Sequence, residues 1–78
     1  MYREVIVRLA NGNQAIVRVE DATRTEITDQ EAKRSAYIWA YGNEEGEADN
    51  PDLVNEYCQI PGYKITIPLQ PQSFNQQS

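Results

Sequence analysis

The most constraining feature of this sequence is a pair of alternating segments near the N-terminus, residues 2–9 and 14–20. In each segment apolar and polar side chains alternate, so one face is apolar and the other carries most of the charge. A period of two residues with one wet face is typical of strands in an antiparallel sheet. The intervening Asn11-Gly12-Asn13 is a strong signal for a hairpin turn. The chain is therefore expected to begin with a β-hairpin.

The same pattern limits the register of the hairpin. A two-residue Asn-Gly turn would put the apolar side chains of the second strand on the wrong face, because a slip of one residue reverses every side chain. A three-residue loop avoids this, with Asn13 near the left-handed backbone region as a bulge. The expected pairs are Leu9 with Ala15, Val7 with Val17, and Val5 with Val19.

A helix is predicted over residues 29–41. Thr28 and Glu31 fit a capping box at its start, and Gly42 provides a left-handed stop. At about 100° per residue the small side chains fall on one stripe, which lets the helix approach a sheet closely. The stripe expected to face the sheet consists of Ala32, Ala36, Trp39 and Ala40.

The remaining residues predict one further strand. Residues 44–50 form an acidic loop, and Asn50 is a suitable N-cap for a short helical turn over residues 51–57. After a turn at Pro61-Gly62, residues 63–69 alternate again and predict a third strand. The polar residues 70–78 are expected to be a disordered tail.

These elements define one α+β domain over residues 1–69, in the order β-β-α-β. We expect a three-stranded antiparallel sheet with one main helix packed on one face and a short helical turn before the last strand. The expected core consists of Val5, Val7, Val17, Val19, Ala32, Ala36, Trp39, Ile65 and Ile67.

The composition argues against an enzyme. The 78 residues include no histidine and one cysteine, Cys58, so the commonest general base and the usual zinc ligands are missing. No phosphate-binding glycine motif or nucleophile elbow is present. We therefore expect a non-enzymatic protein without metal or cofactor, in which Cys58 is a small buried or half-buried apolar residue.

The apolar runs are short. The longest, residues 36–41, is far below the roughly 20 residues that a transmembrane helix needs. The first residues are charged and alternating, unlike a signal peptide. A soluble cytoplasmic protein is the expectation.

The net charge of −5 lies entirely in the C-terminal half. Residues 1–42 balance six basic against six acidic side chains, whereas residues 43–78 carry only Lys64 against six acids. Such a chain is poorly suited to bind nucleic acid directly, because phosphates require facing cations. The acidic side chains of this half are Glu44, Glu45, Glu47, Asp49, Asp52 and Glu56.

Three interpretations of this acidic segment are open. It can be a solvated loop that keeps the domain soluble. It can bind calcium, although the spacing lacks the EF-hand pattern. It can also be an electrostatic interaction surface, in which a row of carboxylates fills a protein groove that normally receives nucleic-acid phosphates.

Two other surfaces are candidates for contact with a partner. The helix side with Arg34, Tyr37, Ile38 and Tyr41 is rich in residue types found at binding hot spots. The alternative is that Leu53 and Tyr57 fold over this side and make it a second core layer.

The second of these surfaces is the outer face of the sheet, which is expected to carry Ile6 and Ile16 among charged residues and to lack the stacking aromatics of RNA-binding sheets. It is expected to be an ordinary salt-bridged surface or a dimer face. The charged residues placed there are Arg3, Glu4, Arg8, Arg18, Glu20 and Lys64.

The pattern of Thr28, Glu31, Ala32 and Ala36 on a helix after a two-stranded hairpin, in a short acidic chain, resembles several small phage-encoded inhibitors. These include anti-CRISPR proteins and phage inhibitors of host RNA polymerase. The resemblance covers residues 1–69 and implies stoichiometric binding to a larger protein that handles nucleic acid, in the bacterial cytoplasm.

Two functions follow as hypotheses. The first is a protein-binding inhibitor or adaptor whose acidic segment faces a basic groove. The second is a small structural or regulatory homo-oligomer, in which the acidic loop serves only solubility. The residues expected to contact a partner are Glu44, Glu45, Glu47, Asp49, Asp52, Glu56, Tyr37 and Tyr41.

Overall fold

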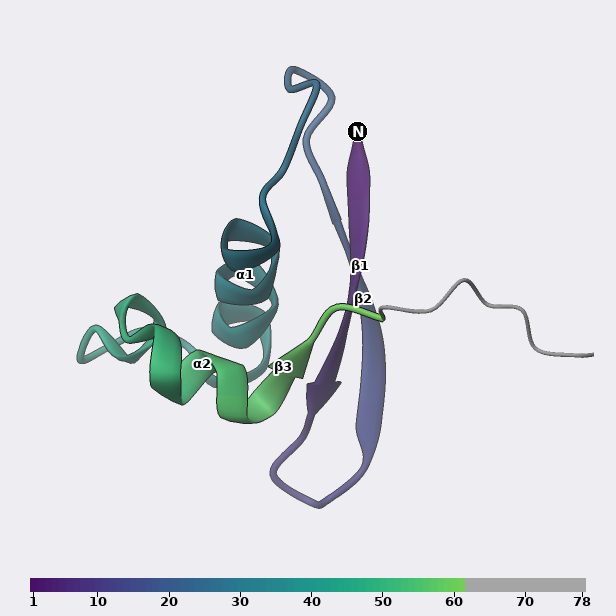
Figure 1. Ribbon diagram of the computed structural model, residues 1–78. Coiled ribbons are helices and arrows are strands. Elements are labelled where there is room, and N and C mark those ends of the chain that lie inside the picture. The colour runs from purple at the N-terminus through teal and green to yellow at the C-terminus, as the bar shows by residue number, and fades with distance from the viewer. Residues whose placement is uncertain (62–78) are drawn as a thin grey trace, which may run out of the picture.

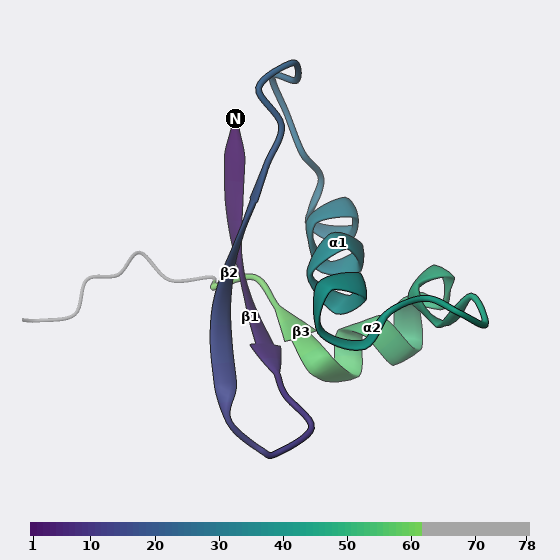
Figure 2. The same ribbon diagram turned by 180° about the vertical axis from the view of Figure 1, so that it is seen from behind.

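The structure, a computed structural model that describes residues 1–61, has a sheet layer and a helical layer (Figure 1). The sheet is antiparallel with the strand order β2-β1-β3, and α1 lies over one face of it (Figure 2). The predicted α+β class and β-β-α-β order are confirmed. Within these residues, no helix is both long enough and apolar enough to span a membrane. The elements are β1 (Tyr2–Arg8), β2 (Gln14–Glu20), α1 (Asp29–Tyr41), η1 (Glu47–Asp49), α2 (Pro51–Tyr57) and β3 (Cys58–Gln59).

The register of the hairpin differs from the predicted one by two residues. The Leu9 N–H donates to the Asn13 carbonyl at 2.7 Å and closes the loop, in which Gly12 has the left-handed φ of 90° that was expected of Asn13. A shift of two residues leaves each side chain on its face, so the hydrophobic pattern could not separate the two registers. The position of the left-handed glycine decides between them. The observed pairs are Arg3 with Val19, Val5 with Val17, and Val7 with Ala15.

The ends of α1 agree with the prediction. The Glu31 N–H donates to the Thr28 hydroxyl at 3.1 Å, and the Thr28 N–H donates to the Glu31 carboxylate at 3.0 Å. At the other end, Gly42 has φ of 79° and its N–H donates to the Ile38 carbonyl. Both ends are fixed by neighbouring residues, which is why the sequence located them.

The predicted sheet-facing stripe of α1 is confirmed for Ala32 and Ala36, which are fully buried, and is wrong for Trp39. Trp39, placed in the core by the sequence, is 62% exposed, whereas Tyr37 is only 6% exposed. Two residues of a helix that are two positions apart point in nearly opposite directions, so only one of them can face the core. The side of α1 that carries Tyr37 is buried because α2 packs beside it (Figure 1).

An aromatic cluster joins the two helices. The ring of Tyr57 in α2 lies 6.0 Å from that of Tyr37 and 5.1 Å from that of Tyr41, and the two α1 rings are 5.0 Å apart. The Tyr41 hydroxyl donates to the carbonyl of Arg8, and the Arg8 guanidinium lies 4.7 Å above the Tyr57 ring. The alternative in which the segment around Tyr57 covers this side of the helix and forms a second core layer is therefore confirmed.

The core also contains residues that the sequence did not mark. Ile27, which directly precedes the N-cap of α1, is 3% exposed. A residue at this position can form a hydrophobic staple with the fourth residue of the helix. That residue is Ala32, which is fully buried. Val17 and Val19 are half-buried and pack against the core. The buried core residues are Val5, Val7, Ile27, Ala32, Ala36, Tyr37, Ala48, Val54 and Cys58.

The third strand of the described residues is the short β3. It pairs Gln59 with Ile6 and Cys58 with Val7. Continued in the same register, it would bring Pro61 opposite Glu4, and a proline has no N–H to donate to the ladder. The strand predicted over residues 63–69, with its core residues Ile65 and Ile67, and the tail 70–78 lie outside the described residues.

Candidate functional site

The acidic segment is anchored to the fold at several points. Asn43 accepts a hydrogen bond from the Ala48 N–H at 2.8 Å, and Ala48 is buried at 3% exposure. Gly46 provides a left-handed residue before η1, with φ of 77°. The side chain of Asn50 accepts from the Asp52 and Leu53 N–H groups and caps α2. The segment is thus a structured turn followed by a short helix.

The carboxylates of this segment point to solvent, and we call them the acidic surface. Glu47 is half-buried and the other five are exposed. Asp49 forms an ion pair with Arg34 at 2.9 Å, and within residues 1–61 the other five carboxylates have no ion-pair partner. Figures 1 and 2 show the turn that carries η1 at the end of the helical layer farthest from the strands. The acidic surface consists of Glu44, Glu45, Glu47, Asp49, Asp52 and Glu56.

The two tyrosines predicted to contact a partner pack against Tyr57 of α2 instead. Tyr37 is buried, and desolvation raises the pKa of its hydroxyl. Tyr41 is half-buried, and its hydroxyl is engaged by the Arg8 carbonyl. Both side chains therefore hold α2 against α1, and the structure does not present Tyr37 to a partner.

Two observations within the described residues concern metal binding and the reactivity of the thiol. Residues 1–61 hold no group of three or more histidine, cysteine or carboxylate side chains placed to bind a metal ion. Cys58 is 1% exposed, its thiol donates to the Lys33 carbonyl at 3.6 Å, and burial raises its pKa. A thiol in this setting stays protonated and is a poor nucleophile.

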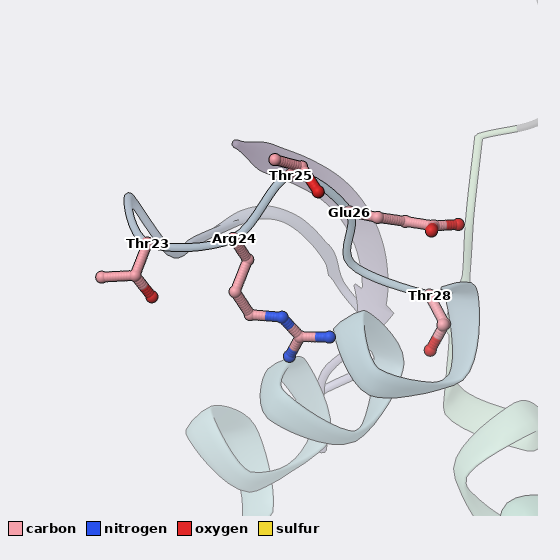
Figure 3. Close-up of a pocket in the computed structure, with 5 residues that line it drawn as sticks. All are labelled: Thr23, Arg24, Thr25, Glu26 and Thr28. Carbon is pink, nitrogen blue, oxygen red and sulfur yellow. The ribbon is translucent and has the colours of Figure 1, made fainter.

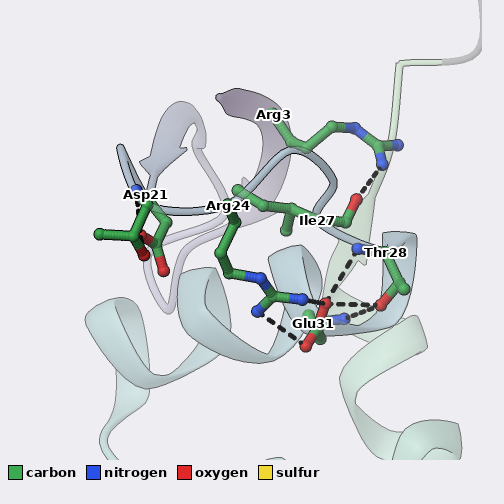
Figure 4. A network of polar contacts seen from close by, with 7 residues as sticks. Arg3, Asp21, Arg24, Ile27, Thr28 and Glu31 are labelled. Carbon is green, nitrogen blue, oxygen red and sulfur yellow. Dashed lines mark hydrogen bonds and ion pairs between the residues drawn. The ribbon is translucent and has the colours of Figure 1, made fainter.

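A surface hollow of about 380 Å³ lies in the connection between β2 and α1 (Figure 3). Its one cation, Arg24, points toward α1 and donates to both oxygens of Glu31, at 3.0 and 2.9 Å (Figure 4). The hydrogen bonds from Arg24 and from the Thr28 backbone lower the pKa of Glu31 to about 2. Because the guanidinium is already paired, the hollow has no spare charge for an anionic ligand. The lining residues are Thr23, Arg24, Thr25, Glu26 and Thr28.

A second hollow of about 60 Å³ lies where the acidic surface meets the outer face of the sheet. This is room for about two water molecules, so it cannot enclose a substrate. It brings Glu56 of the acidic surface near Arg8 of β1. The lining residues are Ile6, Arg8, Gln14, Glu56, Tyr57 and Gln59.

The outer face of the sheet is uncovered among the described residues. Ile16 at its centre is 67% exposed and is paired across the strands with Ile6. This face also carries an aromatic side chain that was not expected there. Tyr2 is 50% exposed, and the Arg18 guanidinium lies 3.9 Å from the centre of its ring. The even-numbered positions of both strands share this face, which would have identified Tyr2.

The placement of Arg3 on this outer face is wrong. Its guanidinium donates to the Ile27 carbonyl at 2.6 Å (Figure 4). It also forms an ion pair with Asp29 at the start of α1. Arg3 therefore ties the sheet to the helical layer. Odd-numbered residues of β1 point toward α1, so strand periodicity already excluded Arg3 from the outer face. Lys64, also placed there, lies outside the described residues.

No protein-family model, curated protein or solved structure matches this chain.

Proposed function

We propose that this protein is a non-enzymatic inhibitor or adaptor that binds a larger protein through its acidic surface. The observation that carries the proposal is the anchored turn and short helix that hold six carboxylates, of which only Asp49 is neutralised by an ion pair within residues 1–61. A loop that served only solubility would not need Asn43, Ala48 and Asn50 to fix its shape. Fixed charges lose less conformational entropy on binding than mobile ones do.

The partner that fits such a surface carries a basic groove. Clustered carboxylates produce a negative potential that attracts a basic surface and speeds the encounter, and dissolved salt screens this attraction. A groove that normally receives nucleic-acid phosphates has this character. The proposed partner is accordingly a bacterial protein that handles nucleic acid, met in the host cytoplasm, and the proposed mode is that of the phage-encoded inhibitors that the chain resembles.

In this proposal the tyrosines have a positioning role. Tyr37, Tyr41 and Tyr57 pack together and fix α2, which carries Asp52 and Glu56. These two acids are one turn apart and therefore share one side of α2. Loss of the cluster would change where that part of the acidic surface points.

Affinity purification from a bacterial lysate, followed by mass spectrometry, identifies the partner. The decisive comparison then uses two triple variants with equal change in net charge. The first, E44Q/E45Q/E56Q, neutralises part of the acidic surface, and the second, E4Q/E20Q/E26Q, neutralises exposed carboxylates elsewhere. We expect the first variant to associate with the partner at least about tenfold more slowly, and the second to resemble the wild type.

Raising the salt concentration should weaken binding of the wild type and should have less effect on the first variant. Equal association rates for the two triple variants would show that the acidic surface is a solvated loop. Recovery of the chain alone from the lysate would favour the second candidate, a homo-oligomer. The exposed Ile16, on a strand that no other described segment covers, supports that candidate.

A further inference from the structure

The outer edge of β2 is open among the described residues. The strand order β2-β1-β3 leaves β2 with a partner on one side only (Figures 1 and 2). The Asp21 N–H donates to the Met1 carbonyl at 2.9 Å, and the Leu9 N–H donates to the Asn13 carbonyl at 2.7 Å. Residues 13 and 21 thus bond toward β1, and the direction alternates along an antiparallel strand. The backbone groups that point outward are those of Gln14, Ile16, Arg18 and Glu20.

This edge lacks several of the features that prevent strand addition. Proteins protect edge strands with charged side chains, lysine above all, and with proline, a bulge or a short length. β2 contains no lysine or proline and pairs with β1 over seven consecutive positions without a bulge, and its two charges, Arg18 and Glu20, form an ion pair with each other at 3.4 Å. β2 carries incompletely buried apolar side chains on both sides of the sheet, since Ile16 on the outer side is 67% exposed and Val17 and Val19 are only half-buried beside α1.

We propose that β2 pairs in antiparallel orientation with β2 of a second copy of this chain, around a twofold axis at Val17. The two sheets then form one continuous sheet with the order β3-β1-β2-β2-β1-β3. The pairing is isologous, so each copy contributes the same edge. In this register Ile16 lies opposite Arg18 of the second copy, and Gln14 lies opposite Glu20. All of the outward backbone groups of both strands are then hydrogen-bonded.

The side chains are self-complementary in this register. On the side toward α1, Val17 meets Val17 of the second copy and Ala15 meets Val19, which extends the apolar layer. On the outer side no two like charges are opposed. Arg18 is already held by Glu20 at 3.4 Å and by the ring of Tyr2, which places its charge over β1 and leaves its aliphatic stem to contact Ile16.

Neighbouring registers are worse. A shift that keeps each face but centres the axis on Arg18 would oppose two arginines, which destabilises a cross-strand pair. A shift that centres it on Ile16 leaves Glu20 without a partner in the strand. A one-residue slip would oppose the apolar side of one copy to the polar side of the other. The open edge therefore favours one arrangement of two identical chains.

The test measures the dissociation constant of the full chain by sedimentation equilibrium, for the wild type and three variants. I16K places a cation opposite Arg18 of the second copy, and we expect it to raise the dimer dissociation constant about tenfold or more. Adding R18E to I16K restores opposite charges in the proposed register, so the double variant should regain most of the lost affinity. I6T changes the same outer face on the central strand β1 and should leave dimerisation within about twofold of the wild type.

Amide hydrogen exchange locates the contact. The N–H groups of Ile16 and Arg18 should exchange rapidly in the dilute monomer and become protected as the dimer forms. A monomer at millimolar concentration overturns the proposal. A dimer that I6T disrupts overturns it in favour of packing between outer sheet faces, and a dimer that I16K leaves intact overturns it in favour of a contact elsewhere on the molecule. Protection of both amides in the dilute monomer would show that the chain covers its own edge, and it also contradicts the proposal.

Discussion

The burial of Tyr37 and the exposure of Trp39 in α1 can be tested by truncating each side chain in turn. Tyr37 is 6% exposed and belongs to the core, whereas Trp39 is 62% exposed. Truncation of a buried aromatic side chain costs about 3–5 kcal/mol, because both the transfer free energy and the packing around the cavity are lost. A domain of this size has a free energy of unfolding of roughly 4–12 kcal/mol, so Y37A should be severely destabilised.

The expected effect of W39A is much smaller. Full burial of a large apolar side chain is worth about 1.5–3 kcal/mol, and Trp39 keeps well over half of its surface in water. The substitution leaves no enclosed cavity, and alanine has the higher helix propensity. We therefore expect W39A to lower the free energy of unfolding by about 1 kcal/mol or less. Y37F, which retains the buried ring, is the control for Y37A and should unfold near the wild type.

Urea unfolding followed by far-UV circular dichroism measures these differences. Intrinsic fluorescence gives independent evidence, because Trp39 is the only tryptophan of the chain. Its emission in the native protein should lie near that of tryptophan in water, and acrylamide should quench it readily. Blue-shifted, poorly quenched emission, or a loss of several kcal/mol in W39A, would refute the reasoning and return Trp39 to the core.

Three further changes test local features of the fold. G12A should lower the free energy of unfolding by about 1–2 kcal/mol in a urea titration. An added Cβ meets no atom within 4 Å, so the whole cost comes from the backbone φ of 90°. G12N should cost less, because asparagine tolerates a positive φ better than alanine does. T28A removes the N-cap of α1 and should cost about 1 kcal/mol by the same measurement, whereas T28S should be nearly neutral. Glu31 has a pKa of about 2 in the folded protein against an ordinary value of 4.5, because Arg24 and the Thr28 backbone stabilise its carboxylate. The stability that it contributes is present above about pH 4.5 and is lost as the pH falls toward 2, so E31Q should flatten this part of an acid-unfolding curve followed by circular dichroism.

The features that the sequence located correctly depend on neighbouring residues. The capping pair Thr28 and Glu31, the stop at Gly42, and the Asn50 cap of α2 each act within one turn of backbone. These contacts form wherever the rest of the chain lies. For the same reason the acidic surface could be located from the sequence as a turn followed by a short helix.

The errors concern contacts between distant segments. α1 is apolar on two sides, and only the packing of α2 against it determines that Tyr37, and not Trp39, is buried. Likewise, the hairpin registers that differ by two residues bury the same faces, so a loop hydrogen bond and Gly12 decide between them. The ion pair between Arg34 and Asp49 joins residues fifteen positions apart, and no local pattern indicates it.

The two proposed interactions use opposite sides of the molecule and respond to salt with opposite signs. The acidic surface belongs to η1 and α2, on the side of β3, whereas the open edge of β2 is across the sheet (Figure 1). A dimer formed through β2 would therefore leave both acidic surfaces exposed. Each copy carries a net charge of −5, so salt screens repulsion between the copies and should strengthen the dimer. Binding of a basic partner should weaken over the same range. A salt titration that moves both equilibria in the same direction would contradict one of the two assignments, and the variants I16K and E44Q/E45Q/E56Q would identify which.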